Sequence, residues 1–517
     1  MMDEVSESYV SHKIKTRQEL SEILGPRPRA KKVIMCHGAF DVVHPGHVRH
    51  MLYAKSKADI LVCSLTADEY IMKADMRPYV PQELRAINLS AFEVVDYVII
   101  DTEPTPLSNL EALQPDFFAK GYEYTAGQVH PKTREEMDVL ESYGGEMIFT
   151  PGDIVYSSSA LLNLAAPQIA PEKLWVLMEG EKISFDDLRE TLDGFSDLRV
   201  HVLGDTIIDT YTNCDVIGGI TKTPTISVRY NTKTDYVGGA GIVAKHLRAT
   251  GASVAFSTVL GDDIYRDFVL EDLNAAGVEC HAIVDSTRPT TNKNAIIADG
   301  YRMLKIDTLD NRSISQQRCE KLANQISEIP SDIVVFSDFR HGIFNRDTIF
   351  HLSDAIPEGV FRVADSQVAS RWGNILEFQN FDLITPNERE ARFSLGDQDS
   401  VVRPLATELF KQANCKTLMM KLGERGILTY RTRPKTDLRT VIVLDHFVDE
   451  LKDPVGAGDA LLAYASLSLK STGNEGIATI LGSLAAAVEC EHDGNIPVQP
   501  SDVRKKIDVL DRHLRYG

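Results

Sequence analysis

Two histidines separated by a proline and a glycine are the first residues of this sequence whose spacing could do chemistry. His44 and His47 follow a short apolar run, 33–36, and precede a segment, 48–57, whose pattern predicts a helix. A buried strand, a glycine-containing turn and a helix N-terminus together form a site for an anion. Imidazole nitrogens can donate hydrogen bonds to phosphate oxygens. The pair therefore predicts a phosphate-binding turn, and the simpler alternative is a turn with two incidental histidines.

The residues around the two histidines narrow this choice. The stretch from Gly38 to His47 reads Gly-Ala-Phe-Asp-Val-Val-His-Pro-Gly-His. It resembles the signature of the nucleotidylyltransferase superfamily, which includes cytidylyltransferases and the adenylyltransferases of sugar activation. Nucleotidyl transfer passes through a crowded, highly negative phosphorus, so clustered cations and N–H donors are what the chemistry needs. The resemblance implies that His44 and His47 bind the oxygens on which this charge builds up.

The same resemblance implies roles for residues further along the chain. Lys73 lies where relatives place a phosphate-binding lysine, so it joins the two histidines as a catalytic residue. Tyr122 stands where the heptose-1-phosphate adenylyltransferases have glycine, which leaves the sugar and the choice between ATP and CTP open. The three serines at 157–159 could equally cap a predicted helix. The implied nucleotide-binding residues are Gly38, Phe40, Asp41, Arg77, Lys120, Gly121, Ser157, Ser158 and Ser159.

A second phosphate-binding pattern occupies residues 453–460, Asp-Pro-Val-Gly-Ala-Gly-Asp-Ala, ahead of an apolar helix predicted over 461–469. Gly456, Ala457 and Gly458 can present backbone N–H groups to a phosphate at the helix N-terminus. Asp459 would then lie beside the phosphate, where a carboxylate can accept the proton of an attacking hydroxyl. The alternative is that Asp459 only caps the helix.

Other segments of this half occur in the order and spacing of the ribokinase-like sugar kinase family, and the resemblance covers roughly residues 198–500. It implies that Asp459 is the general base and that Gly456 to Gly458, with the Asp459 amide, form the anion hole. The implied sugar ligands are Asp205, Asp209, Gly238 and Gly239; the implied nucleotide ligands are Lys421, Gly423, Gly426 and Asn387; and Asn387 with Glu390 would organise Mg²⁺ through water.

The sequence departs from that family at the sugar pocket. Ile242 follows the glycine pair where the family usually has asparagine. Gln367 and His341 stand where the similar heptose kinases carry lysines. Loss of two cations from such a pocket predicts a less anionic substrate.

Composition and charge indicate which partners and which cellular compartment suit this chain. The 517 residues carry a formal charge of −20, which argues against nucleic acid or an anionic membrane as the main partner. Seven scattered cysteines, an acidic start with no signal-peptide pattern, and no apolar run of about 18 residues predict a cytoplasmic protein with reduced thiols.

The alternation of strands and helices predicts an α/β chain with two domains. We expect an N-terminal extension over 1–30 and a Rossmann-like nucleotidylyltransferase domain over 31–165. A linker over 166–195 would precede a ribokinase-like α/β/α kinase domain over 196–517. Residues 215–230, rich in Thr, Val, Ile and Gly, predict strands that project from the main sheet as a small β lid.

Both halves resemble those of the bifunctional heptose kinase/adenylyltransferases of lipopolysaccharide synthesis, in reversed order. The resemblance predicts ATP-dependent phosphorylation of a sugar or sugar phosphate. Transfer of AMP or CMP from ATP or CTP would follow, with release of pyrophosphate, for surface polysaccharide biosynthesis. Two alternatives stay open: a glycerol- or ribitol-type polyol kinase/cytidylyltransferase, or one silent, regulatory half. Sugar and nucleotides would be the ligands, and family analogy predicts a homodimer through the 215–230 and 292–305 segments.

Overall fold

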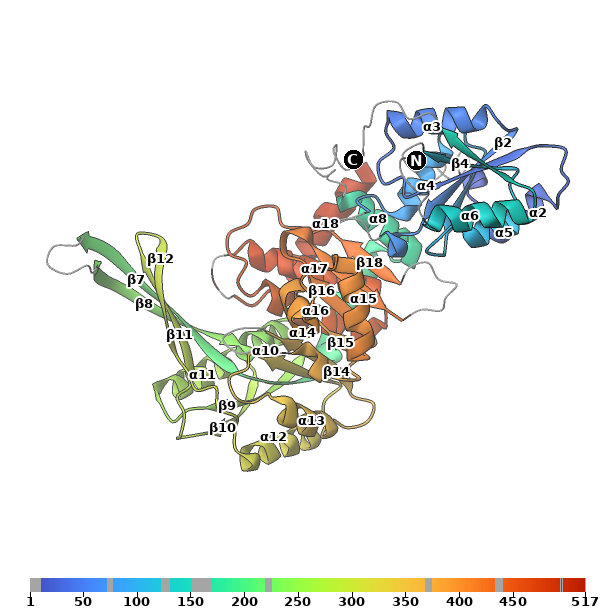
Figure 1. Cartoon of the computed structure of the whole chain (residues 1–517). Helices are drawn as coiled ribbons and strands as arrows, with labels where there is room; N and C mark the ends of the chain where they lie inside the picture. Colours follow the sequence, from blue (N-terminus) through green and yellow to red (C-terminus); the bar gives the residue numbers. More distant parts are fainter. Residues whose placement is uncertain are drawn as a thin grey trace. The chain divides into compact units, whose positions relative to one another are not determined.

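The chain forms two compact units, each described here by itself. In the computed structural model the first unit comprises residues 1–176 with 433–440, and the second comprises 177–432 with 441–517 (Figure 1). The structure describes residues 11–71, 78–121, 131–150, 170–218, 226–367, 374–432, 440–492, 494 and 496–516.

The first unit is built on a five-stranded parallel sheet with the order β3-β2-β1-β4-β5. Strand order reverses on either side of β1, which places a crevice at the carboxyl ends of β1 and β4. The strands are β1 Val33–Gly38, β2 Ile60–Thr66, β3 Tyr97–Asp101, β4 Phe117–Gly121 and β5 Glu146–Thr150. The helices are α2 Arg17–Leu24, α3 Pro45–Lys55, α4 Gln82–Ser90, α5 Leu107–Leu113 and α6 Pro131–Ser142, with 3-10 turns η1 Ser11–Lys13 and η2 Asp68–Tyr70.

Alternate side chains of β1 pack into two separate hydrophobic cores, one on each face of the sheet, as expected for a strand buried on both faces. Ile34 and Cys36 pack with residues of α3 and α4 on one face. Val33 and Met35 pack with residues of α2, α5 and α6 on the other. The Rossmann-like α/β fold predicted for this half is therefore confirmed, and the sheet holds the end of β1 rigidly in place.

The second unit has a nine-stranded sheet with the order β10-β9-β6-β13-β14-β15-β16-β17-β18. Neighbours are parallel from β10 through β16, and β17 and β18 are antiparallel. Its strands are β6 Arg199–Gly204, β9 Ser253–Leu260, β10 Glu279–Val284, β13 Ile333–Asp338, β14 Phe361–Ser366, β15 Leu383–Ile384, β16 Thr417–Lys421, β17 Ile427–Arg431 and β18 Val441–Leu444.

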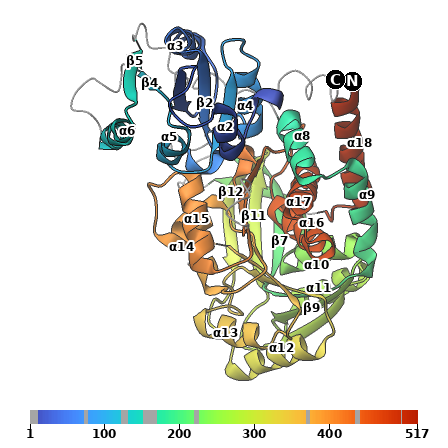
Figure 2. The same ribbon diagram turned by 90° about the vertical axis from the view of Figure 1, so that its right-hand side faces the viewer.

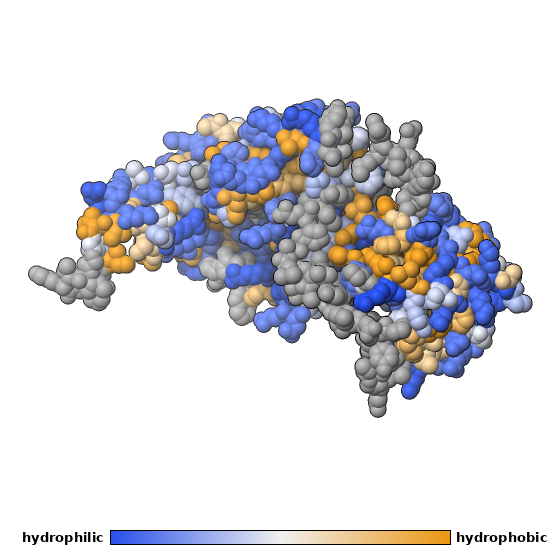
Figure 3. Space-filling view, turned by 90° about the horizontal axis from the view of Figure 1, so that it is seen from above, coloured by the Kyte–Doolittle hydropathy of each residue, from blue (hydrophilic) through white to orange (hydrophobic). Residues whose placement is uncertain are grey.

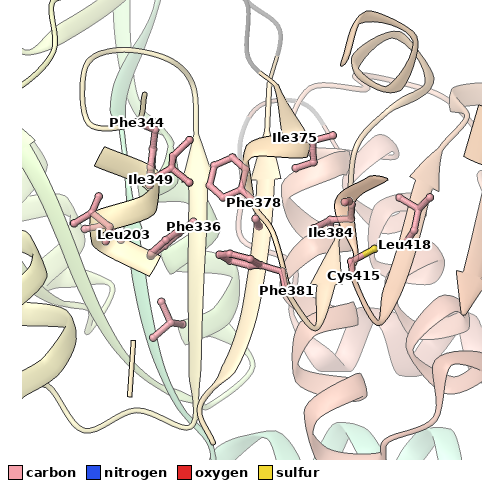
Figure 4. Packing of buried hydrophobic residues seen from close by; sticks show 14 of the residues in the cluster. Leu203, Phe336, Phe344, Ile349, Ile375, Phe378, Phe381, Ile384, Cys415 and Leu418 are labelled. Atoms are coloured by element: carbon pink, nitrogen blue, oxygen red, sulfur yellow. The ribbon is translucent and has the colours of Figure 1, made fainter. Parts of the chain in front are cut away.

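Helices cover both faces of this sheet, with α10, α16 and α17 on one side and α14 and α15 on the other (Figure 2). Four phenylalanines, at 336, 344, 378 and 381, form the centre of one of the hydrophobic layers (Figure 4). The helices are α9 Phe185–Asp193, α10 Ala240–Ala249, α11 Ile264–Ala275, α12 Gln316–Glu328, α13 Arg346–Asp354, α14 Glu388–Leu395, α15 Val402–Ala413, α16 Ala457–Thr472, α17 Glu475–Cys490 and α18 Pro500–Tyr516. The described 3-10 turns of this unit are η4 Gly194–Asp197, η5 Ile375–Glu377 and η6 Gly423–Arg425.

A separate four-stranded sheet projects from the body of the second unit and forms the lid (Figure 1). Its order is β12-β11-β7-β8, and its strands are β7 Thr206–Gly218, β8 Ser227–Gly239, β11 Thr291–Ala298 and β12 Tyr301–Thr308. The projecting strands predicted around 215–230 are present. They are longer than expected, because the lid begins at the end of β6 and returns at the start of α10. Exposed apolar side chains gather towards its far end (Figure 3).

The segment predicted as a linker, 166–195, contains two helices where it is described. The boundary between the two units falls inside it, at 176/177, within α8 Ala170–Glu181. Arg431, which is fully buried, pairs with Glu181 near the end of α8 and with Glu475. Arg189 of α9 pairs with Asp511 of α18 at 2.8 Å. Residues 177–193 are therefore packed into the second unit.

Candidate active sites

The histidine turn of the first unit has the geometry of a small, rigid anion site. His44 caps α3 and the two imidazoles stack with their ring centres 4.0 Å apart. Phe40 lies against the His47 ring at 5.3 Å, with a positive φ of 48°. Burial, with His44 and His50 nearby, lowers the pKa of His47 to about 4, and burial also lowers the pKa of His44. Both rings are therefore neutral near pH 7.

The orientation of His44 is set by the turn itself. The Gly46 N–H donates to His44 Nδ1 at 3.1 Å, so Nδ1 is the unprotonated nitrogen of the neutral ring. Nε2 then carries the hydrogen and is the donor available to a phosphate oxygen. A side chain at Gly46 would displace the His44 ring, because its Cβ would lie 2.8 Å from His44 Cε1. The motif therefore has glycine at this position because the His44 ring lies close to the Gly46 backbone.

Arg85 holds the loop before the histidines in place. Its guanidinium is fully buried and donates to main-chain oxygens of Ala39, Thr66 and Val80 while pairing with Asp68. These contacts join the ends of β1 and β2 to the start of α4. Arg85 therefore positions the turn that carries His44.

The other transferase residues predicted from the sequence fall into two groups. Gly38, Asp41, Lys120 and Gly121 lie at or just beyond the carboxyl ends of β1 and β4, as a site at the crevice requires. Asp41 Oδ1 accepts the Val80 N–H at 3.0 Å, and Lys120 pairs with Glu136 and donates to Thr133 Oγ1 at 3.0 Å. Outside the described residues lie Lys73, Arg77, Tyr122, Ser157, Ser158 and Ser159.

Asp459 lies in the first turn of α16, behind the glycines of its motif. It is buried, at 9 % exposure, and its Oδ1 has no hydrogen-bond partner among the described residues. Burial, and then the neighbouring Asp365, raise the pKa of Asp459 to about 8, while Lys421 lowers it. An unpartnered buried carboxylate with a raised pKa is what a general base requires. The helix-cap alternative receives no support, because the N-cap residue is Gly456, with φ 88°.

Two backbone amides of the predicted anion hole donate to main-chain oxygens. The Asp459 amide donates to Gly456 O at 2.9 Å and the Ala457 amide to Pro454 O at 3.4 Å. Gly458 lies directly against Lys421, since a Cβ on this glycine would be 3.3 Å from Lys421 Nζ. The Lys421 ammonium donates to Asp365 Oδ1 at 2.8 Å, and Thr385 Oγ1 donates to the same oxygen at 2.9 Å.

Asn387 and Glu390 form a capping box at the start of α14. The Asn387 N–H donates to Glu390 Oε2 at 2.7 Å, and Asn387 Nδ2 donates to Oε1 at 2.6 Å. Both carboxylate oxygens are engaged, so a magnesium ion would be held through water without displacing these bonds. Among the described residues, no group of three or more His, Cys, Asp or Glu side chains could hold a metal ion. Gly423 and Gly426 border the turn after β16.

Asp205, which was predicted as a sugar ligand, accepts hydrogen bonds from the loop after β13. Its carboxylate accepts the N–H groups of Phe339 and His341 at 3.1 Å and of Ile343 at 3.3 Å, and the residue is 3 % exposed. It therefore organises the loop after β13. Gly239 packs on its carbonyl, because a Cβ there would lie 2.5 Å from Asp205 O, and Gly239 has φ 60°.

Asp209, the other predicted sugar ligand, faces a mixed-charge cluster on the lid. In the strand register Lys293 of β11 pairs with Asp209 of β7 on one side and Asp307 of β12 on the other. Burial raises the pKa of Asp209, and nearby Lys293 and Lys305 oppose that rise. Burial, with these two lysines, lowers the pKa of His341 to about 3, so its imidazole is neutral.

Several features of these two units were not predicted from the sequence. Asp365 follows a buried strand directly, and the carboxyl end of a parallel strand is where site residues gather, so a signal was present. Lys293 carried no such signal, because its neighbourhood depends on the pairing of three lid strands. The buried setting of Arg85 was equally hidden.

Comparison with known proteins agrees with this geometry. Residues 197–502 match the pfkB family carbohydrate kinases, and residues 35–163 match the cytidylyltransferase-like family. The chain therefore belongs to the pfkB family of carbohydrate kinases and carries an N-terminal cytidylyltransferase-like domain. It is an enzyme that combines a carbohydrate kinase with a nucleotidyltransferase domain, as predicted.

Similar curated proteins carry the name "Bifunctional protein HldE". The one from Desulfatibacillum aliphaticivorans is 28% identical over 66% of this chain and 68% of its own length. The one from Syntrophotalea carbinolica is 36% identical over 28% of this chain and 31% of its own length. The one from Geobacter metallireducens is 39% identical over 26% of this chain and 27% of its own length.

Solved structures match the fold of the second unit. Escherichia coli phosphofructokinase-2 in complex with potassium has a TM-score of 0.51 and 18% identity, covering 61% of this chain and all of that chain. The same enzyme in complex with substrates and products has a TM-score of 0.51 and 19% identity, with the same coverage. The ribokinase-like fold predicted for this half is confirmed. Within the part of the chain that the structure describes, no helix has the length and apolar character to cross a membrane.

Proposed function

We propose that this chain makes a nucleotide-activated sugar in two steps, each catalysed by one of its units. The second unit phosphorylates a sugar with ATP, and the first transfers AMP or CMP to the sugar phosphate with release of pyrophosphate. The observation that carries the proposal is the buried, unpartnered Oδ1 of Asp459 beside a phosphate-binding glycine turn. The stacked His44–His47 pair of the other unit complements it.

In the kinase step the acceptor oxygen forms a bond to the γ-phosphorus of ATP. The bond from that phosphorus to the β–γ bridging oxygen breaks, and its electron pair leaves on ADP. The hydroxyl proton passes to Asp459. A pKa of about 8, raised by burial and by Asp365, makes this carboxylate a stronger base than an ordinary aspartate. Mg²⁺ bound near Asn387 and Glu390 would supply neutralisation of the triphosphate charge.

In the transferase step an oxygen of the sugar phosphate forms a bond to the α-phosphorus of the nucleotide. The bond to pyrophosphate breaks and the electron pair leaves with pyrophosphate. His44 Nε2–H donates to the oxygens that gain charge, and His47 lies stacked beside it. Alignment and charge stabilisation supply most of the acceleration in reactions of this kind.

The charge around Asp209 supports an acceptor that is less anionic than a sugar monophosphate. The carboxylates of Asp209 and Asp307 balance the ammonium groups of Lys293 and Lys305, and His341 is neutral near pH 7 because its pKa is lowered to about 3. No net positive charge therefore remains among these five side chains to balance the phosphate group of a sugar monophosphate. Comparing free sugars with sugar monophosphates as acceptors tests this point, and a strict need for a sugar monophosphate would refute it.

The nucleotide and the sugar phosphate are identified by a pyrophosphate-release screen. Purified full-length chain is incubated with ATP or CTP against a panel of sugar 1-phosphates and polyol phosphates. We expect release with one nucleotide and a narrow group of sugar phosphates, and the variant His44→Ala serves as the blank. A response to glycerol or ribitol phosphate with CTP would favour the polyol alternative, and no release with any pair would contradict a catalytic first unit.

We also propose a cytoplasmic homodimer acting in surface polysaccharide biosynthesis. All seven cysteines are free, as expected for reduced thiols. The exposed apolar side chains of the lid, among them Tyr230, Tyr301 and Leu304, supply a surface that a second copy could cover.

A further inference from the structure

A lysine lies beside the phosphate-binding turn of the kinase unit, at the carboxyl end of strand β16 of the nine-stranded sheet. The Lys421 side chain is 15% exposed, and its ammonium donates to Asp365 Oδ1 at 2.8 Å. Its outer carbons and nitrogen lie along the Cα of Gly458, where an added Cβ would be 3.3 Å from Nζ and 3.6 Å from Cδ. Gly458 has no side chain, so the ammonium reaches the turn next to Asp459.

The surroundings of Lys421 keep it positively charged. Burial alone would lower the pKa of Lys421, but Asp365, Glu390 and Asp459 raise it above its ordinary value. Asp365 is 2% exposed and is also bonded by Thr385 Oγ1, so the carboxylate that anchors the ammonium is itself fixed. A buried cation held by one rigid partner keeps further N–H donors for a ligand.

The geometry points to Lys421 as a catalytic residue of the kinase reaction, its ammonium binding the transferred phosphoryl group beside Gly458. Asp365 is its positioning residue. This inference rests on the proposed kinase function and adds a side-chain cation to an anion hole otherwise made of backbone amides. The unpartnered Oδ1 of buried Asp459 is the second observation that marks this turn as a ligand site.

The physical reason is the charge on the moving group. While the acceptor oxygen bonds to the γ-phosphorus and ADP leaves, three phosphoryl oxygens carry negative charge past Gly458. A preorganised cation in a water-poor site stabilises that charge without reorganisation cost. The amides alone are short of donors, because that of Asp459 already donates to Gly456 O at 2.9 Å.

Four variants separate catalysis from simple neutralisation of Asp365. Lys421→Met removes the cation at nearly constant length, and Lys421→Arg keeps a charge. The double variant Lys421→Met/Asp365→Asn removes both charges, so no buried carboxylate is left unpaired. Lys416→Met is the matched control, because Lys416 precedes the same strand and pairs with Asp382 at 2.7 Å, yet is 78% exposed.

Sugar-dependent ADP formation is measured for each variant, and urea denaturation followed by circular dichroism checks that the second unit is folded. We expect kcat of Lys421→Met to fall about 100- to 1,000-fold, as when one transition-state donor is removed. The KM for ATP should change little. The double variant should stay at least about 30-fold low, added methylammonium should restore part of the Lys421→Met rate, and Lys416→Met should match the wild type.

The inference is overturned if the double variant recovers to within about threefold of the wild-type kcat, because Lys421 would then only balance Asp365. It is also overturned if Lys421→Met alone retains the wild-type kcat. Failure of the proposed function looks different: the wild-type chain would phosphorylate no sugar, or Asp459→Asn would keep full activity.

Discussion

The buried guanidinium of Arg85 gives the sharpest stability prediction for the transferase unit. Replacing Arg85 with Met keeps the length of the side chain and removes donors to three main-chain oxygens, those of Ala39, Thr66 and Val80, as well as the partner of Asp68. An unsatisfied buried acceptor costs about 1–3 kcal/mol, and breaking a buried ion pair about 3–5 kcal/mol. Asp68 is 22% exposed and keeps part of its hydration, so these costs do not add in full.

We therefore expect Arg85→Met to lower the free energy of unfolding of the first unit by about 4 kcal/mol, close to the stability of a marginal domain. Urea denaturation followed by circular dichroism and by loss of pyrophosphate release would measure this change. Kinase activity should be lost at the same urea concentration in this variant as in the wild-type chain. Lys55→Met is the matched control, because Lys55 pairs with Asp96 at 2.6 Å but is 29% exposed, and its loss should cost less than about 1 kcal/mol.

Equal midpoints for Arg85→Met and the wild-type chain would refute this reasoning. They would show that the loop carrying Phe40 is held by other contacts. A variant that is destabilised yet keeps full pyrophosphate release at low temperature would show that Arg85 supports the fold without orienting the histidines.

Three further predictions concern pH, the histidine turn and the lid. Kinase kcat/KM for the sugar should rise about tenfold from pH 7 to 9, because Asp459, with a pKa of about 8, acts only when deprotonated. Transferase kcat/KM should vary little over pH 6–8, because His47, with a pKa of about 4, is already neutral. The pH profiles of both half-reactions check these two predictions. A flat kinase profile would contradict the one for Asp459. Gly46→Ala should lower the transferase rate about 10- to 100-fold, since its methyl displaces the His44 ring; an unchanged kcat would show that ring placement does not limit the reaction. Leu304→Asp, on the exposed lid, should convert a dimer to a monomer in light scattering, and an unchanged mass would place the interface elsewhere.

Much of the framework could be predicted from the sequence, because local signals specified it. The apolar run before His37 and the glycine turn after it predict a strand and a helix start, and both are present as β1 and α3. Asp459 was predicted as a general base from its place behind the glycines of a motif, and the structure places it buried at the start of α16. Short-range patterns of this kind are the ones that sequence reasoning reads well.

What the sequence could not provide were the long-range partners of polar side chains. Asp205 accepts backbone N–H groups that lie 134 to 138 residues away, and no local pattern connects these residues. Lys421 meets Asp365 across 56 residues, and no spacing rule connects them. Such pairs arise when parallel strands of one sheet, such as β14 and β16 on either side of β15, bring their carboxyl ends to the same edge of the sheet.

The two-site claim is tested most directly by measuring both half-reactions in two single variants of the full-length chain. We expect Asp459→Asn to lose sugar-dependent ADP formation while it keeps sugar-phosphate-dependent pyrophosphate release. His44→Ala should show the reverse pattern. Retention by either variant of the half-reaction assigned to its own unit, at the wild-type rate, would contradict the presence of two catalytic sites.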